Sequence, residues 1–75
     1  MNYMDNIRER YINILKDSGL EDDIEFLELE PLDKVMLITY LEREFNVKID
    51  DDELLKCKIH HDVIEYLKVL TNGKS

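Results

Sequence analysis

Residues 29–49 read LEPLDKVMLITYLEREFNVKI, and this stretch decides the fold. Pro31 suits the first position of a helix, because its fixed φ is already helical and its missing N–H would find no partner in the first turn. The apolar residues that follow recur at helical spacing and are Leu32, Val35, Leu37, Ile38, Leu41 and Phe45. Because this stripe is wide, we expect this helix to be the central one.

A helix is also predicted before this stretch, from about Met4 to Ser18. Ile7, Tyr11 and Ile14 recur there on one face, as they do in an amphipathic helix. Gly19 follows and is able to adopt the left-handed conformation that closes a helix.

The connection over residues 20–30 holds much of the net negative charge. It contains six acidic residues and no basic residue, interspersed with apolar side chains. A connection of this length with its own apolar residues packs on the domain, so we expect Phe26 to anchor it.

Two further helices are predicted after the central one. Asp50 and Glu53 have the spacing of a capping box, which indicates a short helix beginning there. The last helix is predicted to begin near His60 and to end before Asn72. The expected fold is all-α, a small four-helix bundle with three longer helices and a short third one. Its expected core consists of Ile7, Tyr11, Ile14, Leu32, Leu37, Leu41, Phe45, Ile64 and Leu67.

Length, charge and cysteine content limit the classes of protein that fit. The 75 residues predict a single domain over residues 1–75. The longest apolar run, Val35 to Ile38, is far too short for a membrane span, so we expect a cytoplasmic protein without a membrane partner. We also expect a monomer. A net charge of −8 argues against nucleic acid and favours a partner with a basic surface. The single cysteine, Cys57, excludes an internal disulfide.

The central stretch resembles the second helix of acyl carrier proteins. The similar pattern is Leu-Glu-Pro-Leu-Asp-Lys-Val, then Leu-Ile, then Leu-Glu-Arg-Glu-Phe. The segment from Phe45 to Glu53 is similar to the family's Phe, three residues, Ile and acidic third helix, and residues 62–67 resemble its closing helix. The resemblance covers most of the chain and implies the acyl-carrier-type bundle.

The residue that carries the family's chemistry is replaced. In acyl carrier proteins the corresponding helix starts with Asp-Ser-Leu-Asp, and its serine carries a phosphopantetheine arm. The resemblance puts Pro31 at that position, and Pro31 has no nucleophile. Ser18 and Ser75 are the only serines, and Ser18 is the alternative attachment point. We therefore expect no cofactor, with phosphopantetheine present only if the attachment site is atypical.

The resemblance also implies where partners bind. Partner enzymes of the family approach acidic residues along the central helix, which implies contacts here at Glu30, Asp33 and Glu42. Met36 and Tyr40 lie one turn apart, and they either face outward as an apolar docking spot or fill gaps at the core edge.

The remaining polar groups have structural interpretations. Residues 50–53 lack the glycine and the spacing of an EF-hand loop, so we expect no metal site. His60 and His61 diverge by about 100° on a helix, so we expect a solvated pair rather than a chelate. Cys57 has apolar neighbours and is expected to be a buried structural thiol. No nucleophile, base and orienting group occur together, so we expect no enzymatic activity.

Three functions fit these observations. The first is an acyl-carrier-like protein without its prosthetic group, which docks to or regulates a carrier-dependent enzyme of fatty acid, polyketide or peptide synthesis. The second is a true acyl or aminoacyl carrier with an atypical or variant attachment site. The third is an acidic inhibitor or immunity-type protein that neutralises a basic protein.

Overall fold

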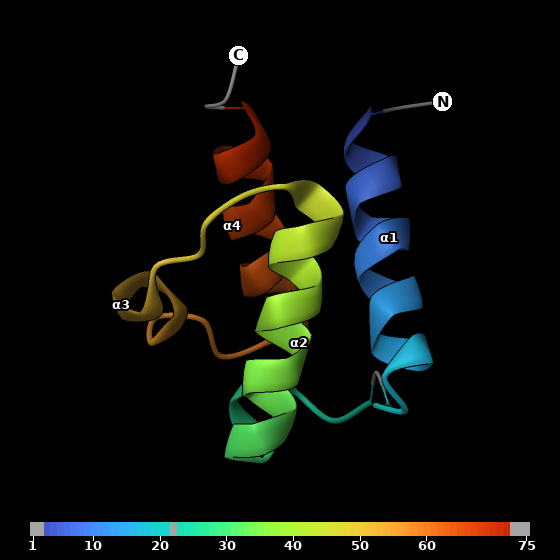
Figure 1. The fold of residues 1–75 in the computed structure, drawn as a ribbon, viewed down its shortest axis with the longest axis vertical. Coiled ribbons are helices and arrows are strands. Elements are labelled where there is room, and N and C mark those ends of the chain that lie inside the picture. The colour runs from blue at the N-terminus through green and yellow to red at the C-terminus, as the bar shows by residue number, and fades with distance from the viewer. Residues whose placement is uncertain (1–2, 22, 73–75) are drawn as a thin grey trace.

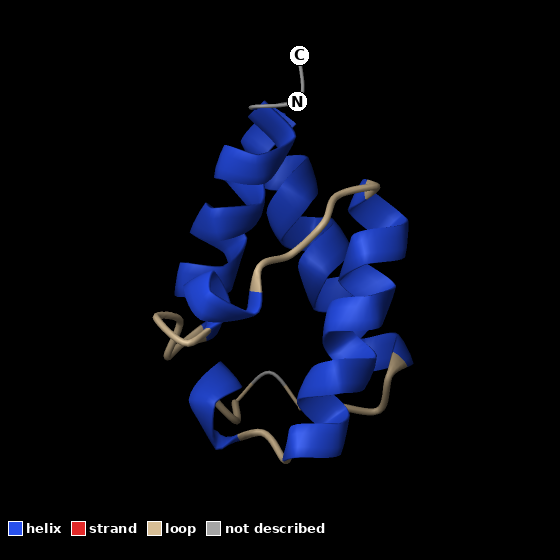
Figure 2. Cartoon of the chain, turned by 60° about the vertical axis from the view of Figure 1, so that its left-hand side comes forward, coloured by secondary structure: helices blue, strands red, loops and turns tan. Residues whose placement is uncertain are grey.

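The computed structural model describes residues 3–21 and 23–72, and all regular structure within them is helical (Figure 2). The elements are α1 (Tyr3–Asp17), η1 (Phe26–Glu28), α2 (Pro31–Phe45), α3 (Asp51–Leu54) and α4 (His60–Asn72). α2 and α4 run antiparallel to α1, and α3 lies to one side of them (Figure 1). The expected four-helix bundle is confirmed. Asp22 and Ser75 lie outside the described residues.

α1 ends in a hydrogen-bonded turn built around Gly19. Gly19 has a φ of +78°, in the left-handed region that a residue with a Cβ rarely adopts. The N–H of Leu20 donates to the carbonyl of Leu15 at 2.9 Å, and the N–H of Gly19 donates to that of Lys16 at 3.0 Å. This pair of bonds is the Schellman motif, so the predicted role of Gly19 is confirmed.

The core gathers side chains from every helix except α3, together with the segments that connect the helices. Its apolar members are Ile7, Tyr11, Leu15, Phe26, Leu29, Leu37, Leu41, Phe45, Ile49, Cys57, Val63, Ile64 and Leu67. Ile14, predicted in the core, packs against it as a half-buried side chain.

The prediction that Leu32 belongs to the core is wrong, and Val35 of the same apolar stripe is exposed as well. Leu32 is 83% exposed and Val35 is 64% exposed. The buried face of α2 passes through Leu37, Leu41 and Phe45, which are four residues apart. At about 100° per residue, Leu32 lies about 180° from Leu41, on the opposite side of the helix. The wide apolar stripe therefore covers two faces, of which only one packs on the bundle.

The connection before α2 is held by Phe26, as predicted. Phe26 is buried, and Lys34 of α2 lies over its ring at 5.6 Å from the centroid. The N–H of Leu27 donates to the carbonyl of Lys58 at 2.9 Å, which joins η1 to the segment before α4. This short helix thus lies against both α2 and the start of α4.

α3 is capped by Asp50, but the capping box is only half formed. The Asp50 carboxylate accepts the N–H of Asp52 at 2.9 Å. Glu53 does not reach back to the Asp50 N–H, which donates instead to the Tyr66 hydroxyl at 3.1 Å. The Glu53 carboxylate pairs with Lys56 at 3.2 Å.

The expectation that both histidines are solvated is wrong for His60. Only 8% of His60 is exposed, because its ring lies between α1 and the connection before η1. His61 is exposed, as expected. Among the described residues, no helix is long and apolar enough to cross a membrane.

Candidate functional site

The start of α2 is exposed and offers no hydroxyl. Pro31 is its first residue, and Glu30 before it has the extended backbone of a cap, with φ −67° and ψ 151°. The Glu30 side chain makes no capping hydrogen bond, while its carbonyl accepts the N–H of Lys34 at 2.9 Å. The free N–H groups of the first turn favour an anion, yet no side chain here can bond one covalently.

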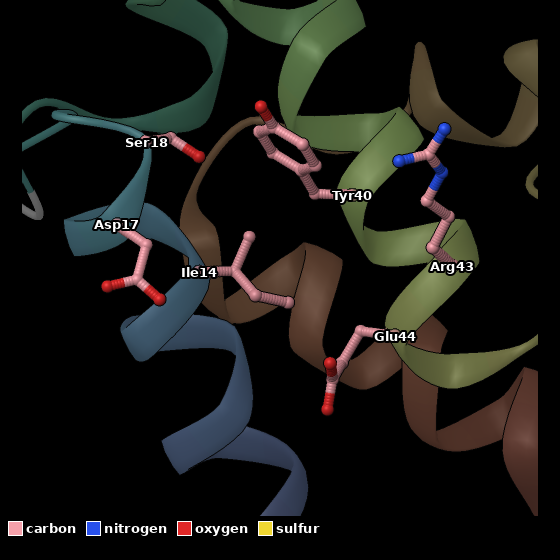
Figure 3. Close-up of a pocket in the computed structure, with 6 residues that line it drawn as sticks. All are labelled: Ile14, Asp17, Ser18, Tyr40, Arg43 and Glu44. Atoms are coloured by element: carbon pink, nitrogen blue, oxygen red, sulfur yellow. The ribbon is translucent and has the colours of Figure 1, made fainter.

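Ser18, the alternative attachment residue, has an enclosed hydroxyl. The Oγ atom is buried and has no hydrogen-bond partner among the described residues. In Figure 3, the side chain extends toward Tyr40 across the space between α1 and α2. A transferase would have to open this region to reach the oxygen, so Ser18 is poorly placed to carry a prosthetic group.

An apolar groove lies beside the outward face of α2. It has a volume of about 530 Å³ and is lined by residues of η1, α2 and α3 and the segment after α3. Its apolar lining includes Phe26, Leu27, Val35, Ile38, Leu54 and Leu55. Leu27, Val35 and Leu55 are exposed as well as apolar. Together with Leu32 they form a nonpolar surface of the kind that marks a site of association.

The predicted partner residues fall on two sides of this surface. Helical geometry puts Asp33, Met36 and Tyr40 within about 60° of one another, on the side of α2 toward α1. Glu42 lies on the other side, and its carboxylate accepts the N–H of Ile49 at 2.9 Å. Glu30 is exposed just before the helix.

Met36 and Tyr40 were predicted either to face outward as an apolar docking spot or to fill gaps at the core edge, and the structure has features of both. Met36 is half-buried, whereas Tyr40 is exposed. Tyr40 also lines a shallow pocket with Ile14 and Ser18 of the α1 end (Figure 3). The pair therefore lies at the margin between the core and the outward face.

Cys57 is buried, as predicted, and lines the groove. Burial raises the pKa of its thiol, with the carboxylates of Asp62 and Glu53 adding to the effect. The neutral thiol is a weak nucleophile, so Cys57 has the properties of a structural residue. Within residues 3–21 and 23–72, no group of three or more acidic, histidine or cysteine side chains is arranged to hold a metal ion.

Comparison with known proteins identifies one relative over nearly the whole chain and others over part of it. An acyl carrier protein of Rickettsia bellii is 31% identical over 77 aligned residues, which cover 91% of this chain and 95% of that protein. The chain belongs to the acyl carrier protein family. Acyl carrier proteins of Rickettsia canadensis and Rickettsia rickettsii are each 44% identical over 45 residues, which cover 60% of this chain and 52% of each protein. No family model and no solved structure matches the chain.

Family membership confirms the resemblance, and the geometry adds residues that the sequence reading missed. Leu32 was assigned to the core and Val35 to the same apolar stripe, but in this chain both are exposed and form an apolar face. A signal was present in the sequence. The stripe from Leu32 to Leu41 spans about half of the helix circumference, which is wider than one packed face needs.

Proposed function

We propose that this member of the acyl carrier protein family acts without a prosthetic group and docks to or regulates a carrier-dependent enzyme of fatty acid, polyketide or peptide synthesis. One observation carries the proposal. The outward face of α2 keeps an exposed apolar surface around Leu32 and Val35, while the start of the same helix, at Pro31, has no hydroxyl. The surface supports binding, and the missing hydroxyl argues against carriage.

The docking surface that we propose combines apolar and acidic residues. Its apolar centre is Leu32 and Val35 with the groove beside them. Its remaining members are the predicted partner residues Glu30, Asp33, Met36, Tyr40 and Glu42. A net charge of −8 favours a partner whose surface is basic around an apolar contact.

The enclosed Ser18 hydroxyl makes a true carrier with an atypical attachment site the weaker alternative. We further infer a protein without catalytic activity, because the hydroxyl that bonds the His60 ring, that of Tyr11, is buried in the core. We also propose that the protein is cytoplasmic and monomeric.

Competition binding tests the proposal. A pull-down first identifies carrier-dependent enzymes that the protein retains. Binding to each purified enzyme is then measured for the wild type, Leu32→Ser and Val69→Ser. Val69 is the matched control, because it is 67% exposed but lies on α4.

We expect the Leu32→Ser variant to bind at least tenfold more weakly, because the apolar centre of an interface holds much of its binding energy. Val69→Ser should bind like the wild type. The host's ordinary acyl carrier protein should also compete for the same enzyme. Equal effects of the two substitutions, or an absence of competition, would argue against the proposed surface.

A further inference from the structure

The groove beside α2 has an apolar wall outside that helix, which we call the η1–α3 wall. It consists of Leu27 of η1 together with Leu54 and Leu55 at the end of α3. Leu27 is 55% exposed and Leu55 is 80% exposed, so both present apolar surface to the solvent. A partner that contacts only the α2 residues would leave this surface uncovered.

Backbone hydrogen bonds hold the η1–α3 wall in place. The Leu27 N–H donates to the Lys58 carbonyl at 2.9 Å and so joins η1 to the segment after α3. The Cys57 N–H donates to the Leu54 carbonyl at 2.9 Å, which closes the turn that leaves α3. Phe26, next to Leu27, is buried in the core. Because the wall is fixed at both of its segments, the groove is formed before a partner arrives, which lowers the cost of binding.

The segments that carry the η1–α3 wall are acidic. Residues 25–30 hold three acidic residues and no basic residue, and residues 50–58 hold four acidic and two basic residues. One of these bases, Lys56, is already paired with a carboxylate of α3 at 3.2 Å. Lys34 of α2 lines the groove, but its Nζ atom lies over the Phe26 ring at 5.6 Å from the centroid. The groove therefore favours an occupant that is apolar at its centre and basic at its edges.

Other occupants fit the groove less well. A second copy of the chain would bring its own charge of −8 against these acids. An added strand has no place to pair, because residues 3–21 and 23–72 contain no strand. The part of α2 from Leu32 to Thr39 extends about 10 Å, or about two helical turns. That length suits a helix laid in the groove with two apolar side chains one turn apart.

We propose that the groove binds one amphipathic helix of the partner enzyme, which inserts two apolar side chains between α2 and the η1–α3 wall. Lysine or arginine residues on the flanks of that helix lie against Glu28 of η1 and Asp51 of α3, both of which are exposed. This proposal deepens the proposed function and rests on it for the class of partner. The capacity of the groove to hold such a helix is a property of this protein and is tested without the enzyme.

Peptide titrations test the occupant directly. The probe is an amphipathic helical peptide of about 14 residues, or nearly four turns, with leucines along one face and lysines on both flanks. One control peptide has glutamates in place of the lysines, and another has the same residues in an order that gives no apolar face. NMR of the full chain should show the lysine peptide shifting the amide signals of Leu27, Val35 and Leu55. Both control peptides should bind at least about tenfold more weakly.

Matched variants locate the bound peptide. Leu55→Ser should weaken binding of the lysine peptide at least about fivefold, whereas Val69→Ser, at an exposed position of α4, should leave it unchanged. Leu55→Met keeps an apolar side chain and should bind like the wild type, which separates a lost contact from a lost fold. Glu28→Gln should weaken binding about two- to threefold, and Glu9→Gln, an exposed change on α1, should not.

Several outcomes would refute this occupant. Equal affinity for the lysine and glutamate peptides would remove the role of charge, and equal affinity for the scrambled peptide would remove the role of the apolar face. Signals that shift only outside the groove would place the binding elsewhere. A dimer in sedimentation experiments that Leu55→Ser abolishes would make a second copy of the chain the occupant instead.

A docking measurement with an identified enzyme separates this proposal from the proposed function. If the peptides bind as expected but no carrier-dependent enzyme does, the docking function fails and the groove keeps its capacity for a basic amphipathic helix. If an enzyme binds the wild type and Leu55→Ser equally well, the docking surface around Leu32 stands, and the partner helix in the groove is refuted.

Discussion

The Glu42 carboxylate accepts the N–H of Ile49 at 2.9 Å, and this bond closes the loop that leads from α2 to α3. The loop leaves α2 through Asn46, whose φ is +53°, and the Val47 N–H donates back to the Glu42 carbonyl at 3.2 Å. Glu42 therefore holds the loop through its side chain and its backbone, besides its proposed place in the docking surface.

Removal of this carboxylate should destabilise the fold. We expect Glu42→Ala to lower the free energy of unfolding by about 1 to 3 kcal/mol, because the buried Ile49 would lose a charged acceptor for its N–H. Urea denaturation measures the change. Glu28→Ala is the control, since Glu28 is exposed and should change stability by less than about 0.5 kcal/mol. Equal values for the two variants would show that the bond contributes nothing.

The two faces of α2 should respond differently to truncation. Leu41 is fully buried, so Leu41→Ala should cost about 2 to 5 kcal/mol, a large share of the stability of a small domain. Leu32→Ala should cost less than about 0.5 kcal/mol, because the side chain is already in water. Chemical denaturation distinguishes the two. A Leu32→Ala cost as large as that of Leu41→Ala would return Leu32 to the core.

Local chemistry explains which parts of this fold the sequence predicts well. Gly19 and Asp50 act on their own turns, and Pro31 acts on the first turn of α2, so their roles follow from residue type and spacing alone. Phe26 is the largest apolar side chain in the acidic connection, so few other residues there could anchor the connection to the core.

The errors arise where distant parts of the chain decide the outcome. Whether Leu32 or Leu37 is buried depends on which face of α2 meets α1. An apolar stripe that covers both faces does not indicate which of them is packed. His60 is buried because Tyr11, 49 residues earlier, supplies a hydroxyl to its ring. A pair of adjacent histidines carries no sign of that contact.

Association with a partner enzyme should slow as salt is added. The acids of residues 20–30, together with Asp33, attract a basic surface from a distance. At about 0.1 M salt, this attraction is largely screened beyond about 10 Å. Stopped-flow measurement between low and physiological ionic strength should show the on-rate fall while the off-rate changes less. An on-rate independent of salt would assign the encounter to the apolar surface around Leu32 instead.

The start of α4 should weaken in acid through Asp62. The N–H groups of Lys58 and Ile59 donate to its carboxylate at 3.0 and 3.3 Å, and these bonds lower the pKa of Asp62. Because the pKa of Asp62 is lower in the folded state, its ionised carboxylate stabilises the fold at pH values above the unfolded-state pKa of about 3.9. This stabilisation is lost as the pH falls through the folded-state pKa.

Asp62→Asn should therefore melt below the wild type at pH 7, and the difference in melting temperature should narrow as the pH falls below about 4. Differential scanning calorimetry at pH 7 and in acid measures it. A difference that persists unchanged in acid would mean that the Asp62 charge is not the cause.

Substitution of Pro31 tests whether the protein carries a phosphopantetheine group or only docks to a partner. The wild type, Pro31→Ser and Pro31→Ala are incubated with coenzyme A and a broad-specificity phosphopantetheinyl transferase, and their intact masses are recorded. Each substitution should cost less than about 1 kcal/mol of stability, chiefly because it returns flexibility to the unfolded chain. Pro31→Ala is the control for that effect, since it adds no hydroxyl.

The intact mass of the wild type is the most direct test of the central claim. We predict no gain for the wild type or Pro31→Ala, and a slow, partial gain of one phosphopantetheine for Pro31→Ser, whose hydroxyl stands at the start of α2. A Pro31→Ser protein that stays unmodified while folded would show that the recognition surface has diverged along with the site. A wild type that gains the group would contradict the account and make Ser18 the residue to examine.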